Sequence, residues 1–255
     1  MKYPILLPNI FNYPFTYESD LDLKIGEYVS VPFGKNKLTG VVWDKLEDNE
    51  QKKFKLKKVF KKLQVNPLKK TTINFLNWFS EYNIIPKGMA LKLMLLPNNE
   101  IEDNIKNNFQ VFESNIKNNS IKLSEDQKKS LKEMIVLKNK FKVHVLQGTT
   151  GSGKTFVYFE ALKSIIQKGF QGLILLPEIG LTGQFQQKFV EYFGFNPAVW
   201  HSGISKKKKE IIWNGISNGK IQVIIGARSS LFLPFKKLGI IIVDEEHDQS
   251  FKQDE

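Results

Sequence analysis

Eight consecutive residues have the composition and spacing of a phosphate-binding loop. They follow the pattern of Gly, any four residues, Gly, Lys and Ser or Thr: Gly148, Thr149, Thr150, Gly151, Ser152, Gly153, Lys154 and Thr155. In such a loop the backbone N–H groups surround phosphate oxygens, the Lys reaches the outer phosphates and the last hydroxyl holds Mg²⁺. The sequence therefore predicts a site for ATP and Mg²⁺, with Thr155 as a metal ligand.

A second group of polar residues directly follows an apolar run. It consists of Asp244, Glu245, Glu246 and His247. Phosphoryl transfer needs a carboxylate that holds Mg²⁺ and a group that orients and deprotonates the attacking water. Because adjacent side chains at the end of a strand diverge, we assign Asp244 to the metal and Glu245 to the water. An acidic surface turn is the alternative interpretation, which the nearby phosphate loop disfavours.

The elements that must position these residues alternate between strand and helix. The apolar run Val143–Leu146 is predicted to be a buried strand that enters the loop, and Lys154–Lys168 a helix that leaves it. Four more apolar runs are typical of strands buried on both faces of a parallel sheet: Leu173–Leu176, Ala198–Trp200, Ile221–Ile225 and Ile240–Val243. Residues 123–255 are therefore predicted to be an α/β, RecA-like lobe with a parallel sheet and flanking helices.

Residues 1–97 show a different pattern. Short β-rich runs separated by turn residues predict a small sheet or barrel: Tyr3–Leu7, Phe11–Tyr17, Tyr28–Phe33 and Leu38–Trp43. Thr71 or Thr72 is predicted to cap a helix that runs through Tyr82, and a second helix is predicted over Met89–Leu96. Residues 98–122 are rich in Asn and are predicted to be a linker.

Composition limits the classes of protein to which the chain can belong. Its 255 residues suffice for one or two domains, and no apolar run approaches a membrane span, so no membrane association is expected. The absence of Cys is typical of a cytoplasmic protein. A formal charge of +12 favours a polyanionic partner, although compositional bias is an alternative. Residues 52–70 carry nine Lys and no acid, which indicates either a solvated face or a partly DNA-facing one.

The motifs resemble those of one helicase family. Gly148–Thr155 and the DExH box Asp244–His247 resemble motifs I and II of superfamily 2 helicases. Longer strings are similar to the PriA family of primosomal replication-restart helicases: Leu175–Thr182, Trp200–Gly203, Gly226–Ser230 and Asp244–Gln253. Leu7-Pro8 and Val31–Gly34 resemble that family's DNA 3′-end-binding domain. The resemblance covers residues 1–97 and 123–255.

The resemblance implies an ATP-dependent 3′→5′ DNA helicase of replication restart and primosome assembly, in the cytoplasm and at the forks of the nucleoid. Its partners would be forked and single-stranded DNA, 3′ ends, single-strand-binding protein and primosome components. Lys154, Asp244, Glu245 and His247 would be catalytic. Gln127 would read adenine, since an amide offers that base both a donor and an acceptor.

The resemblance also implies two sets of DNA-binding residues. The first domain would contribute Phe15, Thr16, Tyr17, Gly34 and Lys57. The lobe would contribute Thr182, His201, Arg228, Ser229 and Phe251, the last by stacking on a base. Arg228 is the single Arg among 38 basic residues, which indicates a bidentate phosphate contact or an internal salt bridge. His201 is either a DNA contact or a packed, hydrogen-bonded side chain.

Three departures from the family pattern bear on function. Thr16 stands where the family has the Asp of a Phe-Asp-Tyr element, so capture of a 3′-OH would lack a charge. The 25 residues 98–122 are too few for the family's winged-helix domain, which is expected to be missing. The sequence ends before the Cys-rich zinc module and the second lobe with its Arg, so zinc is expected only there and little ATP hydrolysis is expected here.

Two other functions fit parts of the sequence. One is another superfamily 2 DExH motor, such as an RNA-dependent ATPase or a restriction translocase, which stimulation by single-stranded RNA would favour. The other is a non-catalytic binder of DNA ends or forks that uses ATP as a structural ligand. That interpretation requires the natural chain to be this short.

Overall fold

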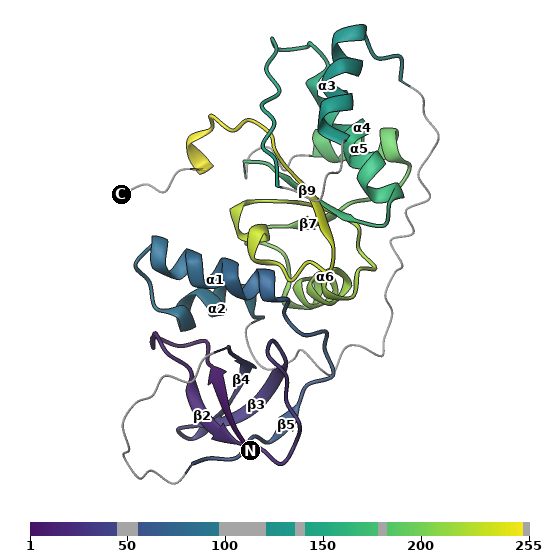
Figure 1. Ribbon diagram of the computed structural model, residues 1–255. Helices are drawn as coiled ribbons and strands as arrows, with labels where there is room; N and C mark the ends of the chain where they lie inside the picture. Colours follow the sequence, from purple (N-terminus) through teal and green to yellow (C-terminus); the bar gives the residue numbers. More distant parts are fainter. Residues whose placement is uncertain (45–55, 97–120, 136–140, 178–182, 252–255) are drawn as a thin grey trace. The chain divides into compact units, whose positions relative to one another are not determined.

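The computed structural model describes residues 1–44, 56–96, 121–135, 141–177 and 183–251. The chain divides into two compact units (Figure 1). The first unit contains Met1–Phe109, Ile204–Asn218 and Phe232–Lys236. The second contains Gln110–Gly203, Gly219–Leu231 and Lys237–Glu255. The chain therefore returns to its first unit twice, and the domain boundaries expected near residues 97 and 123 stay predictions.

An antiparallel sheet of five strands builds the first unit (Figure 1). The strands are β1 (Lys2–Leu6), β2 (Phe15–Glu18), β3 (Tyr28–Phe33), β4 (Asn36–Val42) and β5 (Lys61–Lys62), in the order β2-β1-β4-β3-β5. Side chains alternate between the two faces of a strand, and one face packs a buried core that includes Ile5, Tyr17, Val29 and Val31. The predicted β-rich first domain is thus confirmed.

Residues 57–62, which include β5, join β2 to β3. The backbone N–H of Val59 donates to Glu18 O on β2 at 2.9 Å, and that of Phe60 donates to Ser30 O on β3 at 2.9 Å. One short segment thus covers an edge of β2 and an edge of β3. The sheet is closed in the manner of a barrel, which protects strand edges from pairing with other chains.

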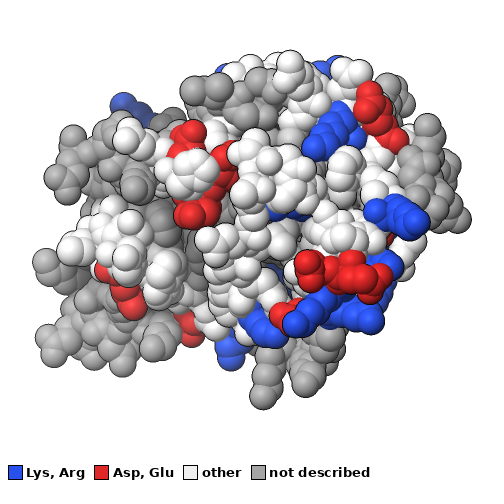
Figure 2. Space-filling view, turned by 90° about the horizontal axis from the view of Figure 1, so that it is seen from above, with Lys and Arg blue, Asp and Glu red and all other residues white. Residues whose placement is uncertain are grey.

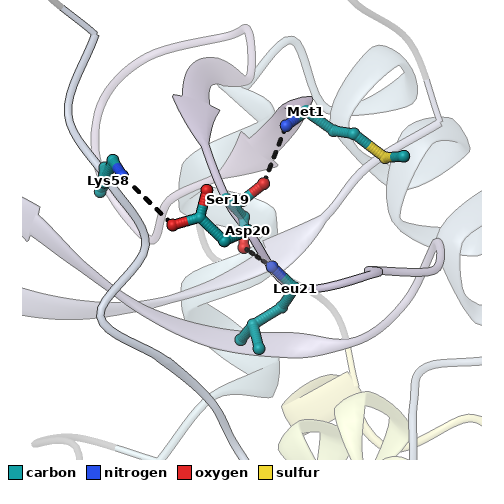
Figure 3. A network of polar contacts seen from close by, with 5 residues as sticks. All are labelled: Met1, Ser19, Asp20, Leu21 and Lys58. Atoms are coloured by element: carbon teal, nitrogen blue, oxygen red, sulfur yellow. Dashed lines mark hydrogen bonds and ion pairs between the residues drawn. The ribbon is translucent and has the colours of Figure 1, made fainter.

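A small polar network holds the start of the chain at this junction (Figure 3). The N-terminal ammonium group of Met1 donates to Ser19 O at 2.9 Å. The backbone N–H of Leu21 donates to Ser19 Oγ at 3.0 Å, and Lys58 Nζ lies 3.1 Å from Asp20 Oδ2. The ion pair is exposed, so the backbone contacts contribute more to fixing this turn than the charges do.

Three helices complete the first unit. They are α1 (Lys70–Tyr82), α2 (Lys87–Met94) and α6 (Lys206–Asn218). Trp213 of α6 is 1% exposed, its Nε1 donates to Met94 O at 2.8 Å, and its ring lies 5.8 Å from that of Tyr28. The prediction of a Thr cap on α1 is wrong: the cap is Lys69 and makes no side-chain hydrogen bond.

The second unit is built on a parallel sheet with the strand order β7-β8-β6-β9 (Figure 1). Its strands are β6 (Gln171–Leu175), β7 (Ala198–Trp200), β8 (Val223–Gly226) and β9 (Leu238–Val243). Its helices are α3 (Glu125–Ile135), α4 (Lys154–Gln167) and α5 (Gly183–Phe193), with the short 3₁₀ helices η2 (Arg228–Phe232) and η3 (Gln249–Phe251). α4 and α5 share one buried core with the strands, in which the rings of Phe159 and Phe189 lie 5.7 Å apart. The predicted parallel α/β fold is confirmed.

The predicted strand Val143–Leu146 is wrong. This segment has no regular secondary structure, and Val143 and Val145 are 71% and 88% exposed. An apolar run becomes a strand only where its backbone pairs with a neighbour, and none of the described strand pairs includes this one. β9 also ends the described sheet, with Ile241 and Val243 45% and 48% exposed. Within the described ranges, no helix is both long and apolar enough to span a membrane.

Candidate active site

The phosphate loop is folded around its own lysine. Lys154 Nζ donates hydrogen bonds to Gly148 O at 2.5 Å and to Thr149 O at 3.1 Å. Gly151 and Gly153 have φ angles of 81° and 80°, which only Gly adopts without strain. α4 begins at Lys154, so the unpaired N–H groups of its first turn and the positive end of its dipole lie at the loop. These donors match the chemistry of a phosphate group.

Gln127 ties the start of α3 to this loop. Its Nε2 donates to Ser152 O at 2.8 Å. Its Oε1 accepts from Ser124 N at 2.9 Å, and its own N–H donates to Ser124 Oγ at 3.2 Å, which is a capping box. A Cβ on Gly153 would lie 2.8 Å from Gln127 Nε2, so this contact also requires Gly there. Gln127 thus lies against the phosphate loop, while its role toward adenine stays a prediction.

Asp244 and Thr155, the two predicted metal ligands, both contact the phenol of Tyr158. The backbone N–H of Asp244 donates to Leu175 O at 3.1 Å, which joins the end of β9 to the end of β6. Asp244 Oδ2 accepts a 2.6 Å hydrogen bond from Tyr158 Oη on α4, and the side chain of Thr155 also hydrogen-bonds to Tyr158. A hydroxyl and a carboxylate oxygen beside a phosphate loop are a ligand set that Mg²⁺ uses. These residues therefore fit the metal.

Glu245 and His247 lie together on the open side of this site. Glu245 has a φ of 52°, in the left-handed region that residues other than Gly rarely adopt, and its N–H donates to Asp244 Oδ1 at 3.1 Å. His247 Nε2 lies 3.4 Å from Glu245 Oε2, and their side chains are 77% and 62% exposed. Strained backbone of this kind is concentrated at functional sites. The catalytic roles of both residues stay predictions.

Sequence reasoning missed Tyr158. It belongs to the apolar face of α4 and is 5% exposed, so its type and periodicity are those of an ordinary core residue. Burial raises the pKa of Tyr158 far above its usual value, and the adjacent Asp244 carboxylate raises it further. The phenol therefore stays protonated and donates to that carboxylate. Its spacing of three residues from Thr155, one helical turn, is the signal that could have identified it.

In the first unit, predicted DNA-binding residues of β2 lie next to the turn between β3 and β4. Tyr17 Oη donates to Pro32 O at 3.1 Å, and the rings of Phe15 and Phe33 lie 5.4 Å apart. Gly34 has a φ of 59°, and no atom lies within 4 Å of the position that its Cβ would occupy. The turn therefore leaves the backbone open to close approach by a ligand.

Thr16 lies within β2, and Lys57 hydrogen-bonds to the end of the same strand. Lys57 O accepts a 3.0 Å hydrogen bond from the N–H of Glu18, the last residue of β2, and the Lys57 residue is exposed. Thr16 is half-buried, and strand alternation directs it to the face opposite Phe15 and Tyr17. Around Phe15, the rings of Phe11 and Tyr13 each lie 5.3 Å away. This aromatic cluster next to the predicted site was also missed by sequence reasoning.

Some of the DNA-binding residues predicted in the second unit follow the carboxyl ends of its strands. His201 follows β7, while Arg228 and Ser229 open η2 after β8 and are exposed. Ala227 N donates to Trp200 O at 3.1 Å, so these two segments adjoin at one edge of the sheet.

His201 Nδ1 accepts a 3.2 Å hydrogen bond from Gly203 N, which matches the hydrogen-bonded alternative for this histidine. Phe251 ends η3 and is half-buried. Thr182 lies outside the described residues. The structure thus brings His201 and Arg228 to neighbouring loops, and their contacts with DNA stay predictions.

Charges of both signs are mixed on the surface. On the face shown in Figure 2, described acidic side chains lie beside basic ones. Ion pairs join Lys62 to Glu27 at 2.5 Å and Lys128 to Glu125 at 2.7 Å. Part of the Lys-rich stretch 52–70 is therefore neutralised by the fold, while residues 52–55 lie outside the described ranges. The net charge therefore does not locate a DNA-binding surface, which must be identified from particular residues.

Two family models together match most of the chain. Residues 4–96 match the PriA 3′DNA-binding domain (3′BD), and residues 124–255 match the DEAD/DEAH box helicase model. The replication restart protein PriA of Rickettsia conorii is 42% identical over 255 residues, which cover 98% of this chain and 38% of that protein. The chain thus spans about two fifths of the length of this relative.

Two further relatives match part of the chain. PriA of Bacillus subtilis is 45% identical over 114 residues, covering 45% of this chain and 14% of that protein. PriA of Helicobacter pylori is 42% identical over 130 residues, covering 51% of this chain and 20% of that protein. The chain belongs to the DEAD/DEAH box helicase family and, with a 3′ DNA-binding domain before its helicase domain, matches the N-terminal part of replication restart protein PriA.

Proposed function

We propose that the chain binds ATP with Mg²⁺ and binds DNA as the N-terminal part of a 3′→5′ DNA helicase of replication restart. One observation carries the nucleotide site: Tyr158 Oη lies 2.6 Å from Asp244 Oδ2, so the acidic box adjoins the helix that leaves the phosphate loop. The relatives named replication restart protein PriA support the biological role. Single-strand-binding protein and primosome components are the protein partners proposed with it, in the cytoplasm at replication forks.

Each residue of the nucleotide site has a distinct task in this proposal. Lys154 and the N–H groups at the start of α4 neutralise and orient the phosphates. Thr155 and Asp244 hold Mg²⁺, which supplies positive charge where negative charge develops during phosphoryl transfer. Glu245, exposed beside them, orients the attacking water, and His247 at 3.4 Å orients Glu245.

The first unit is proposed to take the 3′ end of a DNA strand. Phe15, which is half-buried, offers aromatic surface to the terminal base, while the buried Tyr17 holds the adjoining turn through its hydrogen bond to Pro32 O. The open turn at Gly34 lets the backbone approach. Lys57 contacts phosphate, and the Thr16 hydroxyl, on the other face of β2 from Phe15, bonds to the terminal 3′-OH where the strand end passes the edge of β2. Arg228 and Ser229 contact the phosphates of a single strand in the second unit.

Binding of a fluorescent ATP analogue tests the nucleotide site without requiring turnover. We expect the 255-residue chain to bind the analogue with Mg²⁺ and to lose about tenfold in affinity when the metal is chelated, which corresponds to about 1.4 kcal/mol. No binding, or binding that is indifferent to Mg²⁺, would contradict the proposed site.

Binding of fluorescent DNA forks tests the first unit. The forks carry a recessed leading strand that ends in either a 3′-OH or a 3′-phosphate, and they are compared across a salt series, since the salt slope reports the number of phosphate contacts. We expect tighter binding of the 3′-OH fork. Equal binding of both forks that disappears at moderate salt would indicate a generic basic surface. Tighter binding of single-stranded RNA would favour another DExH motor.

A further inference from the structure

We infer that Tyr158 is a positioning residue that orients Asp244 and Thr155 as ligands of Mg²⁺. The inference rests on the proposed function, because it concerns the same nucleotide site. It adds a residue that neither the phosphate-loop pattern nor the acidic box contains, since Tyr158 lies one turn into α4.

Both oxygens of the Asp244 carboxylate have a fixed donor. Oδ2 accepts from Tyr158 Oη at 2.6 Å, and Oδ1 accepts from the backbone N–H of Glu245 at 3.1 Å. A hydrogen bond from a neutral donor to an ionised acceptor is among the stronger ones in proteins. Each carboxylate oxygen keeps a further lone pair for a cation. The carboxylate is therefore held in one orientation before the metal arrives.

The same phenol also contacts the second predicted ligand. The Thr155 side chain hydrogen-bonds to Tyr158, so the hydroxyl and the carboxylate that would share one cation both contact a single oxygen. Mg²⁺ demands nearly ideal octahedral geometry at short distances, so small displacements of its ligands weaken binding. A group that fixes two ligands relative to each other is thus expected to matter more for Mg²⁺ than for the nucleotide.

Tyr158 is itself held rigidly. Its residue is 5% exposed, and its ring packs edge to face on Phe159 at 5.3 Å within the core shared by α4, α5 and the strands. The alternative is that Tyr158 only fills this core. Tyr192 provides a matched comparison, since it is 4% exposed in the same core and its Oη donates to a carboxylate, that of Glu160 on α4.

The experiment compares Tyr158→Phe with Tyr192→Phe in the 255-residue chain. Each substitution removes one phenolic hydroxyl bonded to a carboxylate and keeps the ring. Binding of the fluorescent ATP analogue is followed while Mg²⁺ is titrated, and thermal unfolding is recorded without ligand. We expect Tyr158→Phe to raise the half-saturating Mg²⁺ concentration about 10-fold, the scale for residues that orient metal ligands, with unchanged affinity for the metal-free analogue. Tyr192→Phe should leave the Mg²⁺ curve unchanged.

A double variant separates positioning from core packing. If Tyr158 acts through the ligands Asp244 and Thr155, then Tyr158→Phe should have a clearly smaller effect on Mg²⁺ dependence in an Asp244→Asn background than in the wild-type chain. Equal Mg²⁺ curves for wild type and Tyr158→Phe would overturn the inference, as would additive effects in the double variant. A wild-type chain that binds the analogue without responding to Mg²⁺ would instead overturn the proposed function.

Discussion

The ammonium group of Lys154 lies 2.5 Å from the carbonyl oxygen of Gly148, so the phosphate loop is closed by its own lysine. The side chain also reaches Thr149 O at 3.1 Å. These contacts are exposed, and a phosphate that enters the loop offers a stronger, charged acceptor for the same ammonium group. The loop is thus preformed around the Lys154 ammonium group, which can exchange its two carbonyl acceptors for phosphate oxygens.

The first prediction concerns this lysine. Lys154→Met keeps an unbranched side chain but removes the charge, so we expect affinity for the fluorescent ATP analogue to fall by about tenfold or more. Lys168→Met, at the other end of α4, is the matched control and should bind normally. Thermal unfolding should change little for either substitution. Normal nucleotide binding by Lys154→Met would contradict the role assigned to this residue.

The second prediction concerns Thr16. Thr16→Asp places a carboxylate where it can accept a hydrogen bond from a terminal 3′-OH, so the preference for a 3′-OH fork over a 3′-phosphate fork should rise. Thr16→Val removes the hydroxyl and should lower that preference. Fluorescence anisotropy with both forks measures the ratio, and Thr71→Val, at an exposed threonine of the same unit, should leave it unchanged. If all three variants gave the wild-type ratio, the 3′ end would be read elsewhere.

The third prediction concerns Glu27 and pH. Burial raises the pKa of Glu27, but hydrogen bonds from the Lys62 side chain and the Lys24 backbone outweigh it, so this pKa lies below its ordinary value of 4.5. A carboxyl with a lower pKa in the folded chain stabilises the fold above its ordinary pKa and loses that contribution as pH falls through the folded pKa. Glu27→Gln should therefore lower the unfolding temperature at pH 7.

The pH dependence provides the check on Glu27. The difference between Glu27→Gln and wild type should shrink as pH falls below 4.5, because the wild-type carboxyl then becomes protonated. At pH 7 the loss should be about 1.5–3 kcal/mol, as for a hydrogen bond to a charged group. Asp20→Asn is the control, since the Asp20 side chain is 86% exposed and should contribute little. A pH-independent difference would refute this assignment.

Local sequence patterns correctly predicted several helices and strands that have a run or a face of apolar residues buried in the core. The strands Tyr28–Phe33 and Ala198–Trp200 have the predicted bounds, and α4 ends one residue before the predicted end. The motifs also indicated that the acidic box and the phosphate loop share one edge of the sheet, since parallel strands end there, and Asp244 contacts Tyr158 on the helix that leaves the loop.

The failures share a different cause. Val143–Leu146 is as apolar as the true strands, but strand formation depends on a pairing partner that no local window contains. Tyr158 looks like a core residue, since nothing in α4 indicates a carboxylate 86 residues later in the sequence. The sequence alone therefore did not indicate that Val143–Leu146 lacks a pairing partner among the described strands, or which side chain bonds to Asp244.

The last prediction concerns a contact of long sequence separation, between Trp213 and Met94, which are 119 residues apart. Trp213→Phe keeps a buried aromatic ring but removes the indole N–H that donates to Met94 O at 2.8 Å. A buried carbonyl that loses its donor costs about 1–3 kcal/mol, and urea unfolding should show a loss of that size. Trp78→Phe, at a residue 54% exposed on α1, should change the free energy of unfolding far less. Equal effects of the two substitutions would mean that α6 does not stabilise the first unit through this bond.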